Sequence, residues 1–343
     1  MKKLFSAGRR DYTISFGIVI IAYLVVQAMI MTGSITSSFK GQLVPICAYI
    51  VMAVSLNLTV GVLGELSLGH AGFMSVGAFT GIVVTTTLAD IIPIGPLRLA
   101  IAMVAGGLGA GLAGVLVGVP VLRLKGDYLA IVTLAFGQII MNIVNVLYIG
   151  KDENGLHFSL LEQKFKLGEG GKMIINGPIG VSGVSKLSTF TAGAVLVLVT
   201  LFLILNLMHS RTGRAVMAVR DNAIAAESIG ISITRYKLLA FVASAVFAGM
   251  AGTLYAMNYS TVTAAKFDFN TSILVLVFVV LGGLGNIWGS MIAAALLTVL
   301  PELLRAVNDY RMLLYAVLLI AMMLFNNSKL KQRLLARRQK EVE

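Results

Sequence analysis

The sequence predicts an all-α polytopic membrane protein with about ten transmembrane helices. Three observations predict this fold class. Hydrophobic residues make up 58% of the chain and charged residues only 12%, whereas about a quarter of the residues in a soluble domain are charged. Apolar runs of about 20 residues, the length that spans a bilayer, recur along the whole chain. Basic residues gather in the segments between these runs, as they do in cytoplasmic loops.

Apolar segments of spanning length define the predicted helices. The chain begins with a basic segment and runs directly into the first of them without a small-x-small cleavage site, so we expect an uncleaved helix rather than a signal peptide. The eighth and ninth segments are short and interrupted by glycine, and they form either two helices or one broken helix with a re-entrant piece. The predicted spans are roughly 12–31, 43–62, 66–88, 98–119, 128–149, 188–208, 237–258, 271–285, 287–304 and 311–326.

We expect one transmembrane domain over residues 1–343, with both termini in the cytoplasm. The positive-inside rule assigns the basic turns and tails to the cytoplasmic side. It thereby accounts for the net charge of +12 without nucleic-acid binding. The segments predicted to lie outside the membrane are an extracytoplasmic loop at 150–187, a cytoplasmic loop at 209–236 and a basic cytoplasmic tail at 327–343.

Two glycine breaks interrupt the apolar runs, one in each half of the chain. Such a pair is a sequence indicator of a transporter's binding region and suggests an inverted repeat. The first break also carries ionisable residues, which are costly at membrane depth and usually face the interior of a bundle. It forms either a translocation-path lining or a tight turn at the inner face. The candidate path residues are Glu65, Ser67, Gly69, His70, Gly282, Gly283, Gly285 and Asn286.

Two further spans carry patterns that indicate contact with other helices. Small residues recur at intervals of three or four positions at Gly107, Gly111, Gly114 and Gly118, and this spacing lets two helix backbones approach closely, within the bundle or against a second subunit. The amides of Gln138, Asn142 and Asn145 recur at helical spacing. We expect them to hydrogen-bond to a neighbouring helix; the alternative is that they face a pore.

The polar, basic segment 209–236 is far longer than a turn between two spans requires. It is rich in good helix formers, contains no proline, and ends its helical pattern at Gly230. An arginine-rich helix in the cytoplasm binds either a soluble partner or the anionic lipid surface. The candidate residues for this contact are Arg211, Gly213, Arg214, Arg220, Asp221, Ala225, Ala226 and Gly230.

Motifs that would indicate an enzyme are missing from the sequence. There is no phosphate-binding loop, no His-Glu-x-x-His, no Gly-x-Ser-x-Gly and no metal-ligand spacing, and Cys47 stands alone in an apolar run. We therefore expect no catalytic activity, no cofactor and no bound metal. If the protein pumps a solute, another subunit must hydrolyse the ATP.

Several long motifs resemble one family. Residues 64–72 (Gly-Glu-Leu-Ser-Leu-Gly-His-Ala-Gly), 176–181 (Asn-Gly-Pro-Ile-Gly-Val), 211–231 and 281–289 (Leu-Gly-Gly-Leu-Gly-Asn-Ile-Trp-Gly) are similar to segments of the permease subunits of branched-chain amino-acid ABC importers, the LivM type in particular. The resemblance covers nearly the whole chain, with the motifs in the same order.

The resemblance implies a set of partners. They are a second homologous permease subunit, two cytoplasmic ATP-binding subunits and an extracytoplasmic substrate-binding protein, assembled in the lipid of the bacterial cell (inner) membrane. Ala225, Ala226 and Gly230 match the coupling-helix pattern that contacts the ATPase, although Ile224 replaces the glutamate of the general importer pattern.

The resemblance also implies a mechanism, namely alternating access driven by the ATPase pair. Three alternatives remain open at this stage. They are the same machine carrying urea, short amides or a sugar, an uncoupled channel or facilitator, and a membrane-embedded enzyme, which the missing constellations disfavour.

Overall fold

The computed structural model of the chain describes residues 2–33, 36–124, 126–152, 155–161 and 171–303, together with 316, 317 and 320. Most of the predicted last span, the whole of the predicted tail and the middle of the predicted outer loop lie outside these residues.

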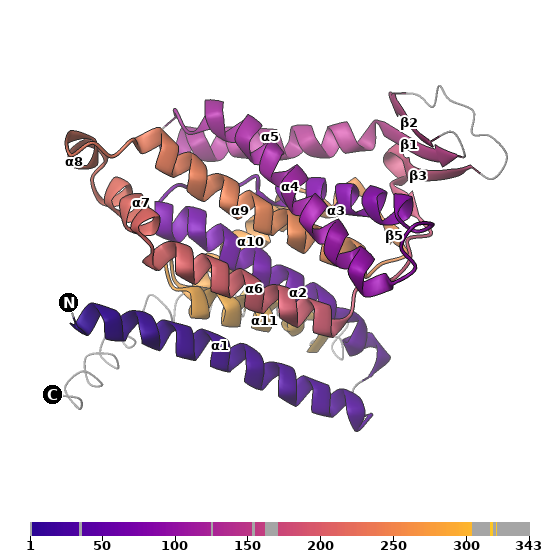
Figure 1. Ribbon diagram of the computed structural model, residues 1–343, viewed down its shortest axis with the longest axis horizontal. Helices are drawn as coiled ribbons and strands as arrows, with labels where there is room; N and C mark the ends of the chain where they lie inside the picture. The colour runs from indigo at the N-terminus through magenta and orange to yellow at the C-terminus, as the bar shows by residue number, and fades with distance from the viewer. Residues whose placement is uncertain are drawn as a thin grey trace.

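Most of the described chain is helical (Figure 1). The helices are α1 (Lys2–Met31), α2 (Ser37–Asn57), α3 (His70–Thr87), α4 (Gly95–Val121), α5 (Asp127–Asn145), α6 (Phe190–His209), α7 (Arg211–Asp221), α8 (Ala223–Ser228), α9 (Ile233–Ala256), α10 (Phe269–Gly282) and α11 (Ile287–Leu303). A π-helix, η1 (Leu58–Leu63), continues α2, and short 3-10 turns lie at η2 (Gly177–Ile179) and η3 (Ala264–Phe267).

Six helical segments among the described residues are long and apolar enough to cross a membrane. They are Ser37–Leu63, Gly95–Val121, Tyr128–Asn145, Phe190–His209, Ile233–Ala256 and Ala264–Gly282. Two shorter apolar helices, Ser15–Met31 and Ile287–Leu303, accompany them. The molecule is therefore a polytopic helical membrane protein, but the predicted number of about ten spans is not confirmed.

The centre of the bundle is built on close contact between α9 and its neighbours α3 and α4. A Cβ placed on Gly77 of α3 would lie 2.1 Å from the carbonyl oxygen of Gly249 in α9, so the two backbones touch at glycines. The glycine ladder of α4 lies against the same helix: a Cβ on Gly114 would lie 2.8 Å from the Cβ of Ala245, and Gly107, Gly111 and Gly118 face other α9 side chains in the same way.

The all-α prediction left out the strands that the structure has in the outer loop region. The predicted span 128–149 ends as a helix at Asn145, and strand β1 (Leu147–Asp152) follows. It pairs antiparallel with β2 (Gly155–Leu160) and β3 (Lys172–Asn176), while β4 (Val181–Ser182) pairs with β5 (Thr261–Val262). The aromatic and β-branched pair Tyr148-Ile149 favours a strand. Strand β2 is the next element of the chain, and β3, which lies further along it, completes the sheet.

The predicted helix of the 209–236 loop is two helices joined at Asn222. This residue has extended backbone (φ −156°, ψ 100°), and its side-chain oxygen accepts a hydrogen bond of 3.0 Å from the Ala225 nitrogen. An asparagine N-cap starts a new helix rather than continuing the preceding one, so the chain turns between α7 and α8.

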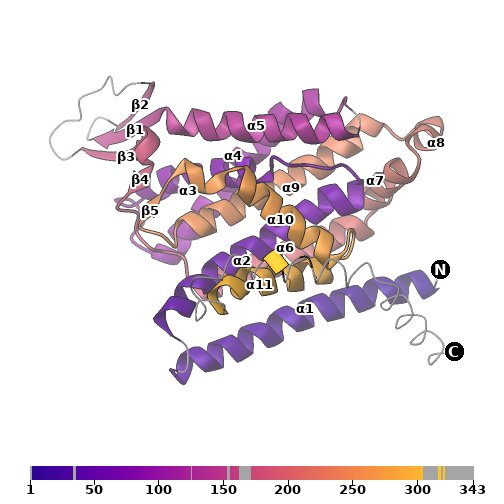
Figure 2. The same cartoon turned by 180° about the vertical axis from the view of Figure 1, so that it is seen from behind.

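The two ends of the molecule differ in what they carry. Figures 1 and 2 show α7 and α8 at one end of the bundle and the strands β1–β3 at the opposite end. Helix α1 begins at the α8 end and runs to the other. At the sheet end, Lys151 of β1 forms a 2.5 Å ion pair with Asp90, and this hydrogen bond holds the pKa of the Asp90 carboxyl below its ordinary value.

Candidate translocation and coupling site

The two glycine breaks, far apart in the sequence, meet at one buried amide. Asn57, the last residue of α2, is fully buried and donates from Nδ2 to Ser290 Oγ (2.9 Å). Its Oδ1 accepts from the backbone nitrogen of Gly285 (2.8 Å). The approach requires a glycine, because a Cβ on Gly61 would lie 2.0 Å from Asn57 Oδ1 and 2.2 Å from the Gly285 nitrogen. The end of α2 and the α10–α11 break are thus connected directly.

The first break starts with a π-helix. In η1 the backbone turn is one residue wider than in an α-helix, a distortion that is common at functional sites. The π-helix ends at Gly64, whose φ of +80° places it in the left-handed region, and the Glu65 nitrogen donates back to the Thr59 carbonyl (3.1 Å). Residues 64–69 then run without helical structure, so α3 begins at His70 and not at 66 as predicted.

Helix α7 contacts this break through Arg220. The guanidinium Nη1 donates a 3.1 Å hydrogen bond to the Gly61 carbonyl, while Nε and Nη2 donate to Asp221 Oδ1 at 2.9 and 2.8 Å. The arginine stem lies directly on Gly64, where a Cβ would be 2.6 Å from Arg220 Cγ. Below it, the buried Val216 of α7 packs with apolar residues of η1. The polar loop and the glycine break are therefore one contiguous structure.

Glu65 is paired with a cation from α9. Its carboxylate contacts Lys237 Nζ, and each side chain is only 14% exposed. Because Lys237 lies near the start of α9, next to the α7–α8 loop, the ion pair sits at the α8 end of the bundle. The carboxylate neutralises this cation and joins α9 to the first break.

The other candidate path residues of the first break are packed inside the protein. His70 is 2% exposed and its Nε2 lies 2.9 Å from Ser55 Oγ of α2. Gly69 lies on α5, where a Cβ would be 2.1 Å from the Thr133 carbonyl oxygen. Ser67 is buried, and no residue of the described chain hydrogen-bonds to its hydroxyl. In this conformation His70 and Gly69 therefore contact neighbouring helices, and Ser67 is enclosed by the protein.

The second break is a tight turn between α10 and α11. Gly283 and Gly285 have φ of +97° and +79°, which a residue with a side chain rarely adopts. A Cβ on Gly289 would lie 2.0 Å from the Gly282 carbonyl, so the two helix ends touch through glycines. Asn286 Oδ1 accepts from the Gly289 nitrogen (3.3 Å), which makes this side chain a cap of α11.

The loop is held to the end of α6 by a second set of contacts. The Ser210 hydroxyl caps α7 by accepting from the Gly213 nitrogen (3.1 Å). A Cβ on Gly213 would lie 2.2 Å from the Leu207 carbonyl, so only glycine allows α7 to fold back this closely. Arg214 Nη1 donates to the His209 carbonyl (3.0 Å), and Arg211 is exposed.

Helix α8 projects from the bundle and exposes two isoleucines. Ala226 is 3% exposed and packs inward, whereas Ile224 and Ile229 are 82% and 74% exposed. Gly230, with a φ of +85°, ends the segment, and its nitrogen donates to the Glu227 carbonyl (2.9 Å). Large apolar side chains exposed on a projecting turn are typical of a surface that another protein covers.

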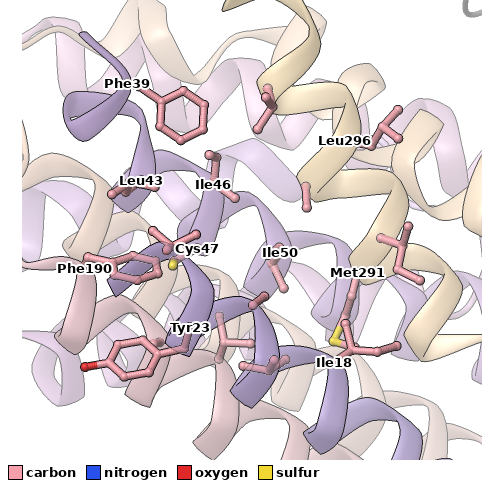
Figure 3. Close-up of a pocket in the computed structure, with 18 residues that line it drawn as sticks. Ile18, Tyr23, Phe39, Leu43, Ile46, Cys47, Ile50, Phe190, Met291 and Leu296 are labelled. Carbon is pink, nitrogen blue, oxygen red and sulfur yellow. The ribbon is translucent and has the colours of Figure 1, made fainter. Parts of the chain in front are cut away.

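Two cavities in the described residues are apolar and lie away from these groups. The first, about 350 Å³, opens between α1, α2, α6 and α11. Figure 3 shows aromatic and aliphatic side chains around it, with Cys47 on α2 among them. The second, about 400 Å³, lies between α3, α5 and the strands. None of the candidate path residues lines either cavity.

Sequence reasoning missed the residues that join the breaks. Asn57 could have been found from the sequence, because it is an amide inside an apolar run and stands one helical turn before Gly61. Its partner Ser290 and the cation Lys237 could not be found in this way, since both contacts join positions far apart in the chain. Among the described residues, no group of His, Cys, Asp or Glu side chains is arranged to hold a metal ion.

A comparison with known families shows which family the chain is related to. Residues 38–324, which include both glycine breaks and the α7–α8 loop, match the model of a family described as the permease component of branched-chain amino acid transport systems. The chain belongs to this family. The resemblance predicted from its motifs is thereby confirmed.

Named relatives show how far the similarity extends. Two proteins called high-affinity branched-chain amino acid transport system permease protein LivM, from Salmonella typhimurium and Escherichia coli, are 38% identical to the chain over 287 residues. The match covers 81% of this chain and 66% of each relative, so the chain spans about two thirds of their length.

More distant similarity reaches an importer of another cargo. The fructose import permease protein FruG of Bifidobacterium longum is 26% identical over 121 residues, 34% of this chain and 36% of that protein. No solved structure matches the chain at a significant level.

Proposed function

We propose that this chain is the transmembrane permease subunit of an ABC importer. It carries branched-chain amino acids into the cytoplasm with ATP hydrolysed by partner subunits. Family membership and the names of the LivM relatives support the transport role. The observation that supports ATP coupling is the contact between Arg220 of the polar loop and Gly61 of the glycine break, because it provides a direct route from a cytoplasmic surface into the bundle.

In this proposal the α8 end faces the cytoplasm of a bacterial cell and the sheet end faces outward. Arginines at 211, 214, 220 and 235 lie on or beside the α7–α8 loop, and positive charge is retained on the cytoplasmic side. Helix α1 begins at the same end, so its first residues are also cytoplasmic. The strands β1–β3 then provide the surface on which a substrate-binding protein docks.

The proposed mechanism begins at α8. Ile224 and Ile229 insert into an apolar groove of an ATP-binding subunit, and closure of the two ATP-binding subunits moves α8 and α7 as a rigid body. Arg220 transmits this movement to η1, and the Glu65–Lys237 pair couples it to α9. Since Asn57 joins η1 to the α10–α11 break, both breaks move together.

The complete importer contains four further subunits and lies in the lipid membrane. A second homologous permease, two ATP-binding subunits and an extracytoplasmic binding protein are proposed as partners. The permease itself needs no cofactor in this account. A zwitterionic amino acid would cross in a hydrated path that opens when the packed breaks separate, because no charged residue lines either of the two apolar cavities.

Reconstitution tests this function. The chain is expressed with a second permease, ATP-binding subunits and a binding protein from the same organism, purified, and placed in liposomes with ATP on the cytoplasmic side. We expect uptake of radiolabelled leucine against its gradient, and none with a non-hydrolysable ATP analogue. Uptake only down the gradient and independent of ATP would establish a facilitator and refute the proposal.

A different cargo is the second candidate, supported by the 26% identity to a fructose importer. The same liposomes, offered leucine, urea, a short amide and fructose in turn, separate the cargo classes. Accumulation of fructose, urea or the amide without leucine would retain the ABC permease function and replace its substrate.

A further inference from the structure

Helix α5 carries three amides on the side that faces away from the bundle. Gln138, Asn142 and Asn145 are separated by four and three residues, which places them on one face of a helix. Asn142 is exposed and the other two are partly exposed. The structure shows no hydrogen bond from their side chains to any residue of the described chain. The predicted bond to a neighbouring helix is therefore not present among the described residues.

The opposite face of α5 is the one that packs. Leu129, Thr133, Gly137 and Val144 are buried against the bundle, and Gly137 lies on Gly69 of the first break. Figure 2 shows α5 along one edge of the molecule, where it spans the distance from the α8 end to the strands. The amide face is thus an outer surface of the subunit.

This surface cannot face lipid. Gln138 lies close to the middle of the apolar segment Tyr128–Asn145, and at that depth no water is available to an amide whose hydrogen bonds are unmade. The outward face of α4 differs sharply: Leu108, Leu112 and Leu116 are 62%, 69% and 76% exposed and carry no polar atom. Helix α4 therefore has the chemistry of a lipid-facing helix, and α5 does not.

The occupant that fits this face is a second permease subunit with a hydrated seam. Exposed Ile131 and Ile139 flank the amides and supply apolar area for helix packing, while the amides hydrogen-bond to the facing subunit or to water between the two. A soluble partner is excluded by the depth of Gln138 within the apolar segment.

We propose that the amide face of α5, carrying Gln138, Asn142 and Asn145, is the surface on which this chain meets the second permease subunit, with water along the seam. The inference rests on the proposed importer function, since that function supplies the second subunit. It adds the location of the contact. The contact lies on α5, the helix whose opposite face packs on the first glycine break.

Photo-cross-linking in the assembled importer tests the location. Benzoylphenylalanine is placed at Asn142, and, as the matched control, at the exposed Leu112 of α4. A third variant at Ile139 covers the same α5 face. Only variants that retain ATP-driven uptake are scored, so a variant that fails to assemble is replaced by its neighbour. We expect an adduct with a permease chain, either homologous or a second copy of this one, from Asn142 or Ile139 and not from Leu112.

Other outcomes overturn the inference without affecting the function. Lipid adducts alone from α5, adducts of equal yield from Leu112, or adducts with an ATP-binding or binding-protein subunit would each place the second permease elsewhere, while uptake by the same liposomes keeps the importer. If no variant and no wild-type complex shows ATP-driven uptake, the proposed function itself fails.

A second experiment measures whether the seam is hydrated. In a chain with Cys47 replaced by serine, Asn142→Cys should react with a charged, membrane-impermeant methanethiosulfonate reagent, whereas Leu112→Cys should not. Equal protection of both cysteines would show a dry α5 face and contradict the hydrated seam.

Discussion

Arg220 of α7 donates a 3.1 Å hydrogen bond to the carbonyl of Gly61, which lies in the π-helix that ends α2. The same end of α2 is also joined to the second glycine break, because the side chain of Asn57 accepts a hydrogen bond from the Gly285 nitrogen. The α7–α8 loop and two breaks from opposite halves of the chain are therefore joined by side chains from a few residues. In the proposed importer, this connection is the physical basis for coupling an ATPase to the bundle.

Replacing Gly61 by alanine tests the contact between the breaks. The added Cβ would lie 2.0 Å from Asn57 Oδ1 and 2.2 Å from the Gly285 nitrogen, so the breaks must separate at a cost of about 1–3 kcal/mol. We expect the thermal unfolding midpoint of the purified complex to fall and leucine uptake to be strongly reduced. Gly41→Ala, where nothing lies within 4 Å of the new Cβ, is the control and should retain both.

The Glu65–Lys237 pair is expected to stabilise the fold more than it would at a surface, since both side chains are only 14% exposed. Removing one partner leaves a buried charge alone, which costs about 3–5 kcal/mol. Glu65→Gln and Lys237→Met should therefore each lower the unfolding midpoint in detergent. The double variant should be more stable than either single one, and additive losses would show that the two charges do not interact.

The exposed isoleucines of α8 are expected to bind the ATP-binding subunit. Ile224→Asp changes a side chain that is 82% exposed, so the permease should insert normally while co-purification of the ATPase is lost. A bulky charged residue at Ala226, which is buried, should abolish uptake by displacing α8 itself. Full uptake and normal co-purification in both variants would rule out α8 as the docking helix.

Local sequence patterns predicted the helices well, because apolar runs of spanning length leave few alternatives. They placed the start of α3 too early. The chain leaves the helix at the end of the π-helix, where Gly64 is left-handed, and the apolar pattern does not show this interruption. The strands were missed because the predicted span 128–149 continued into β1, and because β3 and β5 pair with strands that lie well before them in the chain.

In the candidate site, local sequence likewise predicted the motifs but not the contacts between distant residues. Glycines and ionisable groups marked both breaks, but only the fold shows that Glu65 pairs with Lys237 and that His70 is packed beside Ser55. For the amides of α5 the sequence suggested two interpretations, and choosing between them requires the positions of the neighbouring helices, which local sequence does not provide. The single-helix prediction for the loop was wrong because an N-cap at Asn222 outweighed the good helix formers around it.

The central claim is that α7 transmits ATPase movement through Arg220, and Arg220→Ala tests it most directly. ATP hydrolysis and leucine uptake are measured in the same liposomes, with Arg123→Ala, an exposed arginine outside the α7–α8 loop, as the control. Because Arg220 is 38% exposed, its hydrogen bond to Gly61 contributes about 1 kcal/mol, which corresponds to about a fivefold change in rate. The account predicts that hydrolysis continues while uptake per ATP falls by that factor in Arg220→Ala and is unchanged in Arg123→Ala. Unchanged uptake per ATP in Arg220→Ala would contradict it.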